Sequence, residues 1–366
     1  MATHTFKPDL PPPAMSVGVI GWLRANLFSN WFNTVLTLVG IYVIWLVIPP
    51  LLQWALFKAD WVGTSRADCS REGACWVFIS TRFGQYMYGF YPEALRWRVD
   101  LNVLLVIAGA APLFLRGFHY KLKYGLAYLL ALPLVSFWLL HGGFLGLETV
   151  ATNQWGGLML TVVIAAVGIA GALPLGILLA LGRRSKLPAI KVLCVTTIEF
   201  WRGVPLITVL FMSSVMLPLF LPEGMNLDKL LRAMVMVVLF EAAYIAEVVR
   251  GGMQAIPKGQ YEAAAAMGLG YWRMMGLVIL PQALKLVIPG IVNTFIALFK
   301  DTSLVIIIGL FDFLNSIKRA TADPAWLGMS TEGYVFAALV YWVFCFSMSR
   351  YSLHLERRLD TGHKRR

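Results

Sequence analysis

The sequence predicts an all-α integral membrane protein with about eight transmembrane helices. Two observations indicate this fold class. Hydrophobic residues make up 59% of the 366 residues and charged residues only 14%, proportions far from those of soluble domains. The apolar residues also gather in runs close to the ~20 residues that an α-helix needs to cross a bilayer. Because these runs are continuous rather than alternating, they favour helices over the strands of a β-barrel.

Eight apolar runs are the expected membrane spans. They cover residues 31–51, 101–115, 124–140, 157–181, 192–221, 231–249, 275–299 and 335–348. The fifth run is interrupted by polar residues at 199–205, so we expect a broken helix there. We divide the chain into a segment at 1–30 that ends in an interfacial helix, three additional helices at 31–150 with a loop at about 54–98, a five-span core at 152–352, and a basic tail at 353–366.

The positive charges indicate the orientation in the membrane. The chain has a formal net charge of +12, and its Lys and Arg residues concentrate on one side of the eight expected spans. Cytoplasmic loops of membrane proteins carry such an excess, so we expect both termini and the segment 251–281 to be cytoplasmic. The same rule explains the net positive charge of the chain, so a nucleic acid partner is not needed to account for it.

The segment 251–281 is a polar interruption between the sixth and seventh spans. Pro257 suits the first turn of a helix, and good helix formers follow it. Gly268 then supplies a C-terminal stop. Ala264 and Ala265 would share one nearly smooth side with Gly268. The segment therefore predicts a short helix whose backbone another protein can approach closely.

This short helix carries a signature known from one protein family. Its residues are Glu262, Ala263, Ala264, Gly268, Leu280 and Pro281, with Val278 at an aliphatic position. Their spacing resembles the EAA loop of ABC importer permeases. In that family the loop forms a coupling helix, which sits in a groove of a cytoplasmic ATPase. The resemblance implies a type I ABC importer permease core at 152–352, whereas EAA alone would be an ordinary interfacial helix.

Further stretches resemble permeases for polar amino acids. They are residues 199–206, residues 244–250, and residues 300–304 together with Asn293. The long first loop looks like the M-type subunit of the general L-amino acid permeases of Gram-negative bacteria. The resemblance implies a permease subunit of the bacterial inner membrane that translocates polar or general L-amino acids.

The same resemblance implies partners for this chain. They are a cytoplasmic ABC ATPase dimer, a second homologous permease that would make a heterodimer, a periplasmic amino acid-binding protein, the L-amino acid and the lipid bilayer. The chain has no G-x-x-x-x-G-K-[ST] motif that could cradle a phosphate. ATP and Mg²⁺ would therefore be used by the partner ATPase. We expect this chain to be a transport subunit rather than an enzyme, with no cofactor of its own.

Polar residues within the expected spans are candidates for the substrate path, because such groups are expensive inside a membrane. They are Glu199, Arg202, Glu241, Tyr244, Glu247, Asn293, Asp301 and Thr302. Glu241 lies about ten residues into its span, near the membrane midplane. Its carboxylate could hold an α-ammonium group. The alternatives are a buried protonated carboxyl group or a pair within a dimer.

The other candidates have equally ordinary alternatives. Glu247 and Arg250 are spaced for a local ion pair on one helix. Glu199 and Arg202 flank a break that either marks a transport site or merely bends a structural helix. The last three residues of the set either line a vestibule or cap the end of their helix.

The four cysteines are too few for a disulfide scaffold. Cys69 and Cys75 lie in the long first loop, where an oxidising periplasm allows a small disulfide. Cys194 and Cys345 lie in apolar runs and are expected to be inert packing residues. We find no metal-binding motif in the sequence.

A second function class remains open at this point. An ion-coupled secondary amino acid transporter would work without an ATPase, with Glu241 and Glu247 as proton or sodium sites. Against it, the motif pattern has no second copy in the chain, whereas such transporters often carry internal repeats. A third class, an integral membrane enzyme, is not supported, because the sequence contains no recognisable set of catalytic residues.

Overall fold

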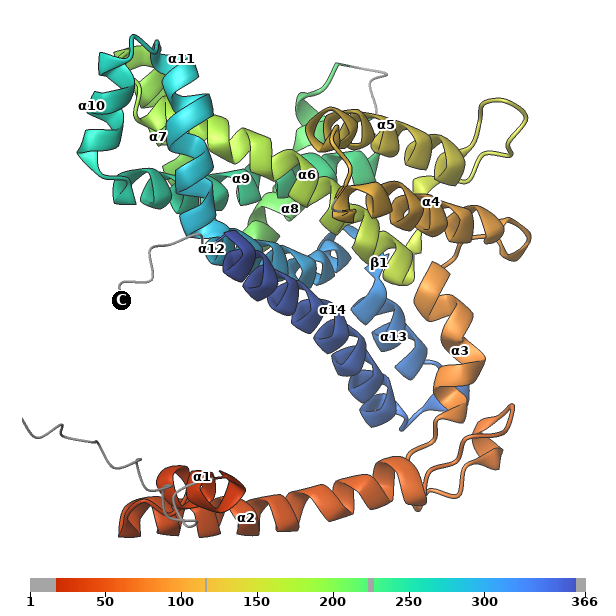
Figure 1. The fold of residues 1–366 in the computed structure, drawn as a ribbon. Coiled ribbons are helices and arrows are strands. Elements are labelled where there is room, and N and C mark those ends of the chain that lie inside the picture. The colour runs from red at the N-terminus through yellow and green to blue at the C-terminus, as the bar shows by residue number, and fades with distance from the viewer. Residues whose placement is uncertain (1–17, 116, 223–226, 360–366) are drawn as a thin grey trace, which may run out of the picture. The chain divides into compact units, whose positions relative to one another are not determined.

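The computed structural model describes residues 18–115, 117–222 and 227–359. These residues are mainly helical, with one short strand, β1 (Phe311–Asp312). The chain divides into two compact units, residues 1–77 and 78–366, which we describe separately (Figure 1). Parts of the expected N-terminal segment and basic tail, at 1–17 and 360–366, lie outside the described residues. The expected boundary near residue 150 stays a prediction.

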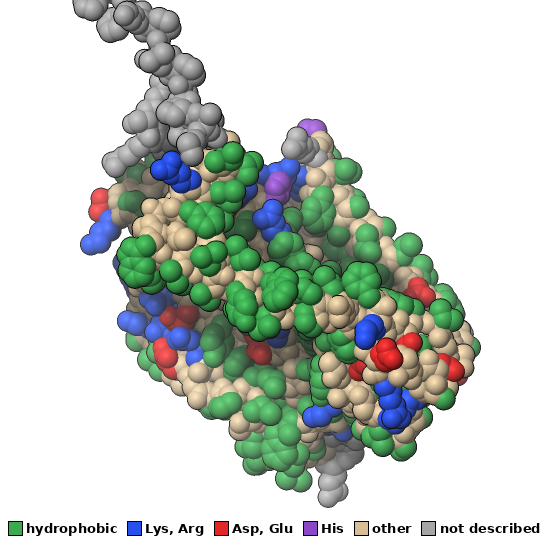
Figure 2. All heavy atoms as spheres, turned by 90° about the horizontal axis from the view of Figure 1, so that it is seen from below, with side chains coloured by type: hydrophobic (Ala, Val, Ile, Leu, Met, Phe, Trp, Pro, Cys, Tyr) green, Lys and Arg blue, Asp and Glu red, His purple; other side chains and the backbone are tan. Residues whose placement is uncertain are grey.

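The first unit contains a long apolar helix. α1 (Gly18–Asn26) is followed by α2 (Trp31–Leu52), which continues as the π-helical segment η2 (Gln53–Phe57). No residue of α2 is buried, although the helix is apolar all round. Such a helix suits lipid rather than water, as expected for the first span. Exposed hydrophobic side chains are widespread on the face shown in Figure 2.

The second unit is a helical bundle. Its helices are α3 (Val77–Tyr88), which begins at the boundary, α4 (Trp97–Phe114), α5 (Lys121–His141), α6 (Gly157–Arg183), α7 (Pro188–Gly203), α8 (Leu206–Val215), α9 (Lys229–Ala255), α10 (Lys258–Ala266), α11 (Tyr271–Met274), α12 (Leu280–Asp301), α13 (Phe313–Thr321) and α14 (Ser330–Leu359). α10 and α11 lie at one end of the bundle and α13 lies at the other (Figure 1).

The packing of α6 against α9 forms the centre of the bundle. Small residues let the two backbones approach closely, as at Gly176, where a Cβ atom would stand 2.9 Å from the carbonyl oxygen of Ala242. Buried hydrophobic residues gather in two clusters along this pair, one toward each end. α4 and α5 contribute Val99 and Leu140 to one cluster, so these two additional helices pack onto the core.

Six of the described helices are long and apolar enough to cross a membrane, and the bent pair α7–α8 would make a seventh. α9 is not among them, although it is 27 residues long and was expected to be the sixth of eight spans. The helix carries several charged residues, Glu241 and Glu247 among them, and many of its residues are buried in the bundle. Charged residues inside a membrane almost always face a bundle interior. The eighth span therefore stays a prediction that rests on α9.

The fifth span is broken as the sequence predicted, and the break lies at the C-terminal end of the polar stretch 199–205. α7 continues through the polar residues up to Gly203, and the axis then turns by 100° into α8. Val204 is extended, with φ −111° and ψ 135°. Proline disfavours a helical conformation in the residue before it, so Pro205 places the break at Val204. The polar side chains at 199–202 lie on a regular helix instead.

The sequence analysis did not predict two short helices, α3 and α13, and placed the end of α14 too early. α3 lies inside the expected loop at 54–98, and α13 follows β1. Both are too short to stand out as spans. α13 does carry a local signal, because the Asp312 side chain accepts hydrogen bonds from the first backbone N–H groups of the helix. α14 runs to Leu359, so the first part of the expected basic tail is helical.

Pro281 does not stop the helix that it follows. α11 passes through the π-helical turn η7 (Met275–Ile279) into α12, and Pro281 occupies the first turn of α12. Proline has no N–H for the regular helical hydrogen bond. A π-turn inserts one extra residue into the hydrogen-bond ladder, and such turns accompany changes of helix direction.

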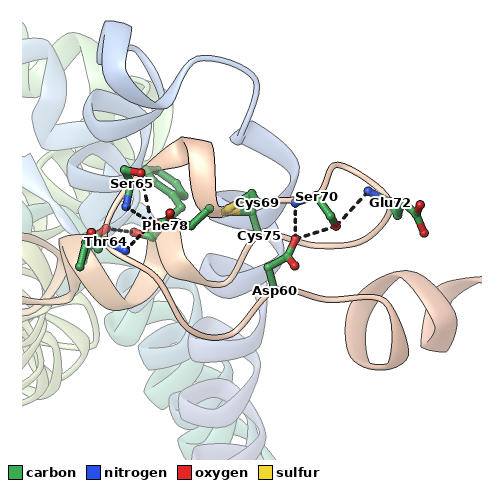
Figure 3. The surroundings of a disulfide bond; sticks show 10 residues. Asp60, Thr64, Ser65, Cys69, Ser70, Glu72, Cys75 and Phe78 are labelled. Carbon is green, nitrogen blue, oxygen red and sulfur yellow. Dashed lines mark hydrogen bonds between the residues drawn. A yellow bond between two sulfur atoms is a disulfide. The ribbon is translucent and has the colours of Figure 1, made fainter.

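Cys69 and Cys75 are joined by a disulfide within the first unit (Figure 3). Asp60 lies beside it and accepts hydrogen bonds from the backbone N–H and the hydroxyl of Ser70, at 2.8 and 2.9 Å. Hydrogen bonds from two nearby backbone N–H groups lower the pKa of Asp68. These bonds tie the short loop around the disulfide to the preceding chain.

We expect thiol counting to find two free cysteines in unreduced, unfolded protein and four after reduction, because two of the four are bonded. Alkylation followed by mass spectrometry provides the count. The Cys69→Ser variant releases Cys75 and should raise the unreduced count by one. Four reactive thiols in unreduced protein would contradict the disulfide.

Gly176→Ala should destabilise the contact between α6 and α9 by about 1–3 kcal/mol, because its Cβ would overpack against backbone. The matched control is Gly251→Ala, at which a Cβ atom meets nothing within 4 Å. Thermal unfolding of the purified protein in detergent compares the two. Equal unfolding midpoints would show that this packing is not tight.

Candidate functional site

The short helix α10 ends in a complete backbone cap. Gly268 has a φ of +73°, in the left-handed region that glycine adopts without strain. Its N–H donates to the carbonyl of Ala265 at 2.9 Å, and the N–H of Leu269 donates to the carbonyl of Ala264 at 3.2 Å. These two bonds form a Schellman motif, which satisfies carbonyls at the helix end. At the other end, Pro257 precedes the helix as its N-cap rather than occupying its first turn.

The exposed side of α10 differs from the one expected. Ala264 is the buried residue of the helix, so it packs against its own chain and is not open to a partner. Ala265 and Gly268 are exposed, as are Glu262 and Ala263. The open surface is therefore built from residues on either side of Ala264.

Large apolar side chains extend this open surface. Met267 is 81% exposed and Trp272 is 70% exposed. Pro281 is also exposed, whereas Leu280 is half-buried and packs against the nearby core cluster. A group of exposed apolar residues beside a polar helix is typical of a protein-binding surface.

An ion-pair network lies where α6, α7 and α9 meet. The Nη1 atom of Arg183 is 2.7 Å from Glu199 on α7 and 2.9 Å from Glu247 on α9. Glu247 also pairs with Arg250 at 2.8 Å, the local pair that their spacing predicts. Glu199 lies 3.9 Å from Arg202 on its own helix. The network thus joins three helices through one arginine at the end of α6.

The network continues toward the middle of α9. The guanidinium of Arg202 stands over the ring of Tyr244, with its central carbon 5.8 Å from the ring centroid. This is the range of a cation–π contact. The ring of Tyr244 in turn lies 5.1 Å from that of Phe240, measured between centroids. Arg202 therefore contacts Tyr244 on α9 as well as Glu199 on its own helix.

The remaining candidates differ in their exposure. Glu241 is only 3% exposed, whereas Asn293 lies on an exposed part of α12. Thr302 donates its hydroxyl to the carbonyl of Phe299 at 2.8 Å, which fits the helix-end role. Asp301 makes no cap for the following 3₁₀ segment η8 (Thr302–Ile308), because it is itself helical, with φ −69° and ψ −14°. Capping is therefore wrong for Asp301.

Sequence reasoning missed Arg183, Arg184 and Tyr261. Arg184 donates a hydrogen bond to the Tyr261 hydroxyl at 2.9 Å, and that hydroxyl donates to the carbonyl of Met253 at 2.8 Å. In the sequence the two arginines were only a topology signal. No spacing relates them to partners that come much later in the chain.

A buried arginine closes the end of α8. Arg232, on α9, donates to the carbonyls of Ser213 and Ser214 at 3.0 and 2.9 Å. These carbonyls lie in the last turn of α8, where the helix dipole favours a positive charge. Arg232 was not among the sequence candidates, since it lies near a helix end and looks like a residue at the membrane surface.

Comparison with known proteins identifies the family. Residues 172–361 match the model of the binding-protein-dependent transport system inner membrane component, more than half of the chain. The chain belongs to this family. The matched region holds α10 and the whole ion-pair network, and it begins after the three additional N-terminal helices.

Two relatives of this permease match over nearly their whole length. It is 63% identical over 355 residues to the inner membrane amino-acid ABC transporter permease protein YhdY of Escherichia coli (strain K12), covering 97% of each chain. It is 41% identical to the glutamate/glutamine/aspartate/asparagine transport system permease protein BztC of Rhodobacter capsulatus, covering 97% of this chain and 96% of the relative. A solved amino acid ABC transporter with histidines is 30% identical over 56% of this chain and 92% of its own, with a TM-score of 0.49.

Family membership decides between the function classes that the sequence left open. The protein is the membrane component of an ABC importer and not an ATPase itself. The reading as a secondary transporter without an ATPase is therefore not supported. The family implies that an ATPase and a binding protein, both on other chains, work with this permease.

The coupling role expected for α10 predicts that Gly268→Ala weakens retention of the ATPase during purification about 5- to 30-fold, because a left-handed alanine costs roughly 1–2 kcal/mol. Gly268→Asn should be milder, since asparagine tolerates this conformation. Gly259→Ala, inside α10 with open space around its Cβ, is the control. If Gly268→Asn weakens retention of the ATPase more than Gly268→Ala, side-chain volume rather than backbone conformation explains why glycine is needed at this position.

Proposed function

We propose that this permease subunit translocates polar or general L-amino acids across the bacterial inner membrane, driven by ATP hydrolysis on a separate subunit. The observation that carries the proposal is the full-length likeness to two proteins named for amino-acid transport, one of them for glutamate, glutamine, aspartate and asparagine. A periplasmic binding protein would deliver the amino acid.

The proposed contact with an ATPase dimer, which uses ATP and Mg²⁺, is α10 and the chain that follows it. The contributing residues are Glu262, Ala263, Ala264, Gly268, Leu280 and Pro281, with Ala264 and Leu280 acting from behind the exposed surface. The exposed apolar side chains of Met267 and Trp272 support this assignment. Basic residues at this end of the bundle, Arg183, Arg184 and Arg273 among them, support a cytoplasmic position for α10.

We propose that a second permease of the same family completes the assembly as a heterodimer. A groove of about 460 Å³ between α7, α8 and α9 supports this. Its lining is almost entirely apolar, with Trp201, Met212, Met216 and Met236 among the residues. Tyr244 and Asn293, two substrate-path candidates, are exposed on this single chain. A path that they line would need walls from another subunit.

The proposed substrate path follows α9 and α12. Glu241, Tyr244, Asn293 and Asp301 keep this role as candidates. Glu199, Arg202 and Glu247 are engaged in the ion-pair network, so we propose that they hold helices rather than bind substrate. An ionised carboxylate buried like that of Glu241 needs a positive partner, which the α-ammonium group of an amino acid supplies, whereas a protonated carboxyl group needs none.

Uptake of labelled amino acids into proteoliposomes tests the function directly. The vesicles would contain this permease with its partner permease and ATPase, and the binding protein would be added outside. We expect uptake of glutamate, glutamine, aspartate and asparagine only when the ATPase side has ATP and Mg²⁺. Uptake without ATP, or uptake of none of these compounds, would overturn the proposal.

Glu241→Gln should raise the half-saturating amino acid concentration about 10- to 100-fold, because a hydrogen bond to a charged group contributes about 1.5–3 kcal/mol. Glu356→Gln, at an exposed glutamate on α14, is the control. Both variants should purify with the ATPase. An unchanged concentration dependence for every amino acid would remove Glu241 from the path and leave the transport function intact.

A further inference from the structure

We propose that Arg183 and Arg184, consecutive residues at the end of α6, transmit the movement of α10 to α7 and α9. This inference rests on the proposed function, in which an ATPase displaces α10. Arg184 would sense the position of α10, and Arg183 would hold or release the two other helices. Both act as positioning residues, since neither needs to touch the transported molecule.

The first step is the contact between α10 and the rest of the bundle. Tyr261 is half-buried, and its hydroxyl both accepts a hydrogen bond from Arg184 and donates one to the carbonyl of Met253 on α9. The Arg184 guanidinium also lies 5.4 Å from the centroid of the Tyr261 ring. A displacement of α10 therefore has to carry Arg184 with it or break these contacts.

The second step is the short connection between the two arginines. Arg184 is the C-cap of α6, and its backbone N–H still bonds to the carbonyl of Leu181 at 3.1 Å. Arg183 is the last residue of the helix. A pull on the Arg184 side chain thus acts on the end of α6, at the residue where the ion-pair network begins.

The third step is the release of Arg183. One nitrogen of its guanidinium serves two carboxylates on two different helices. The side chains of Arg183 and Glu247 are only 24% and 16% exposed, so their charges need partners. When Arg183 leaves, each glutamate keeps an arginine three residues further along its own helix, Arg202 for Glu199 and Arg250 for Glu247. Both glutamates thus have a positive partner whether Arg183 is in place or withdrawn.

This exchange of partners makes the network suitable as a switch. Packed interfaces respond to small displacements by changing between discrete arrangements rather than by deforming smoothly. With Arg183 in place, α7 and α9 are tied to the end of α6. With Arg183 withdrawn, this tie at the end of α6 is lost, and Arg202 stays on Tyr244 beside the proposed path.

The experiment measures amino acid taken up per ATP hydrolysed in proteoliposomes that contain the complete transporter. The variants are Arg184→Gln, Tyr261→Phe, the double variant and Arg183→Gln. Tyr261→Phe removes one hydroxyl group and keeps the ring, so it is the mildest break in the connection. Lys186→Gln is the control, because Lys186 is exposed and makes no ion pair with the described residues.

We expect each single variant to lower uptake per ATP about fivefold or more, the lower end of usual coupling between sites. The complex should still assemble and hydrolyse ATP. The double variant should lose less than the sum of the two single losses, because both changes remove the hydrogen bond between Arg184 and Tyr261, and only Tyr261→Phe also removes the bond to Met253. Lys186→Gln should match the wild type.

Three results would overturn the inference. They are normal uptake per ATP in Arg184→Gln and Tyr261→Phe, additive losses in the double variant, or losses that follow release of the ATPase. The last result would make the contact a structural support for α10 only. Failure of the proposed function is distinguished beforehand, because the wild-type transporter would then show no ATP-dependent uptake at all.

Discussion

The bilayer offers no hydrogen-bond partners, so each interruption of a membrane helix must be satisfied by the protein itself. This constraint explains several features that look unrelated. Arg232 is buried because it supplies donors to the last carbonyls of α8. The π-turn before Pro281 keeps one long helix continuous past a residue without an N–H. Gly203 and Pro205, at the break between α7 and α8, are exposed on this single chain, beside the groove that we propose for a second permease.

The same constraint governs charged side chains. The side chain of Glu247 on α9 is only 16% exposed, and Arg183 lies between it and the more exposed Glu199 of α7. Removing one partner of a buried pair is far more costly than exchanging it for another. Each of these glutamates has a second arginine on its own helix, so the network can open without leaving either carboxylate unpaired. The same ion-pair network can therefore hold the three helices together and also release them.

The sequence was most informative where a single stretch specifies its own structure. The long apolar runs located most of the spans, and the glycine at 268 marked the end of α10 because only a left-handed residue closes a Schellman motif there. Short helices without membrane character, α3 and α13, were missed. The orientation of Ala264 was also wrong, since helical spacing places residues on a common side but does not say which side faces the bundle.

By itself the sequence determined the fold class, the approximate spans and the signature of an importer permease, because hydrophobicity, backbone conformation and motif spacing are local properties. Only the tertiary structure decided which charges meet. Arg183 and Arg184 gain their roles from Glu199, Glu247 and Tyr261, which lie on three other helices. Contacts between distant segments depend on how helices pack around α6 and α9, and no spacing along the chain contains that information.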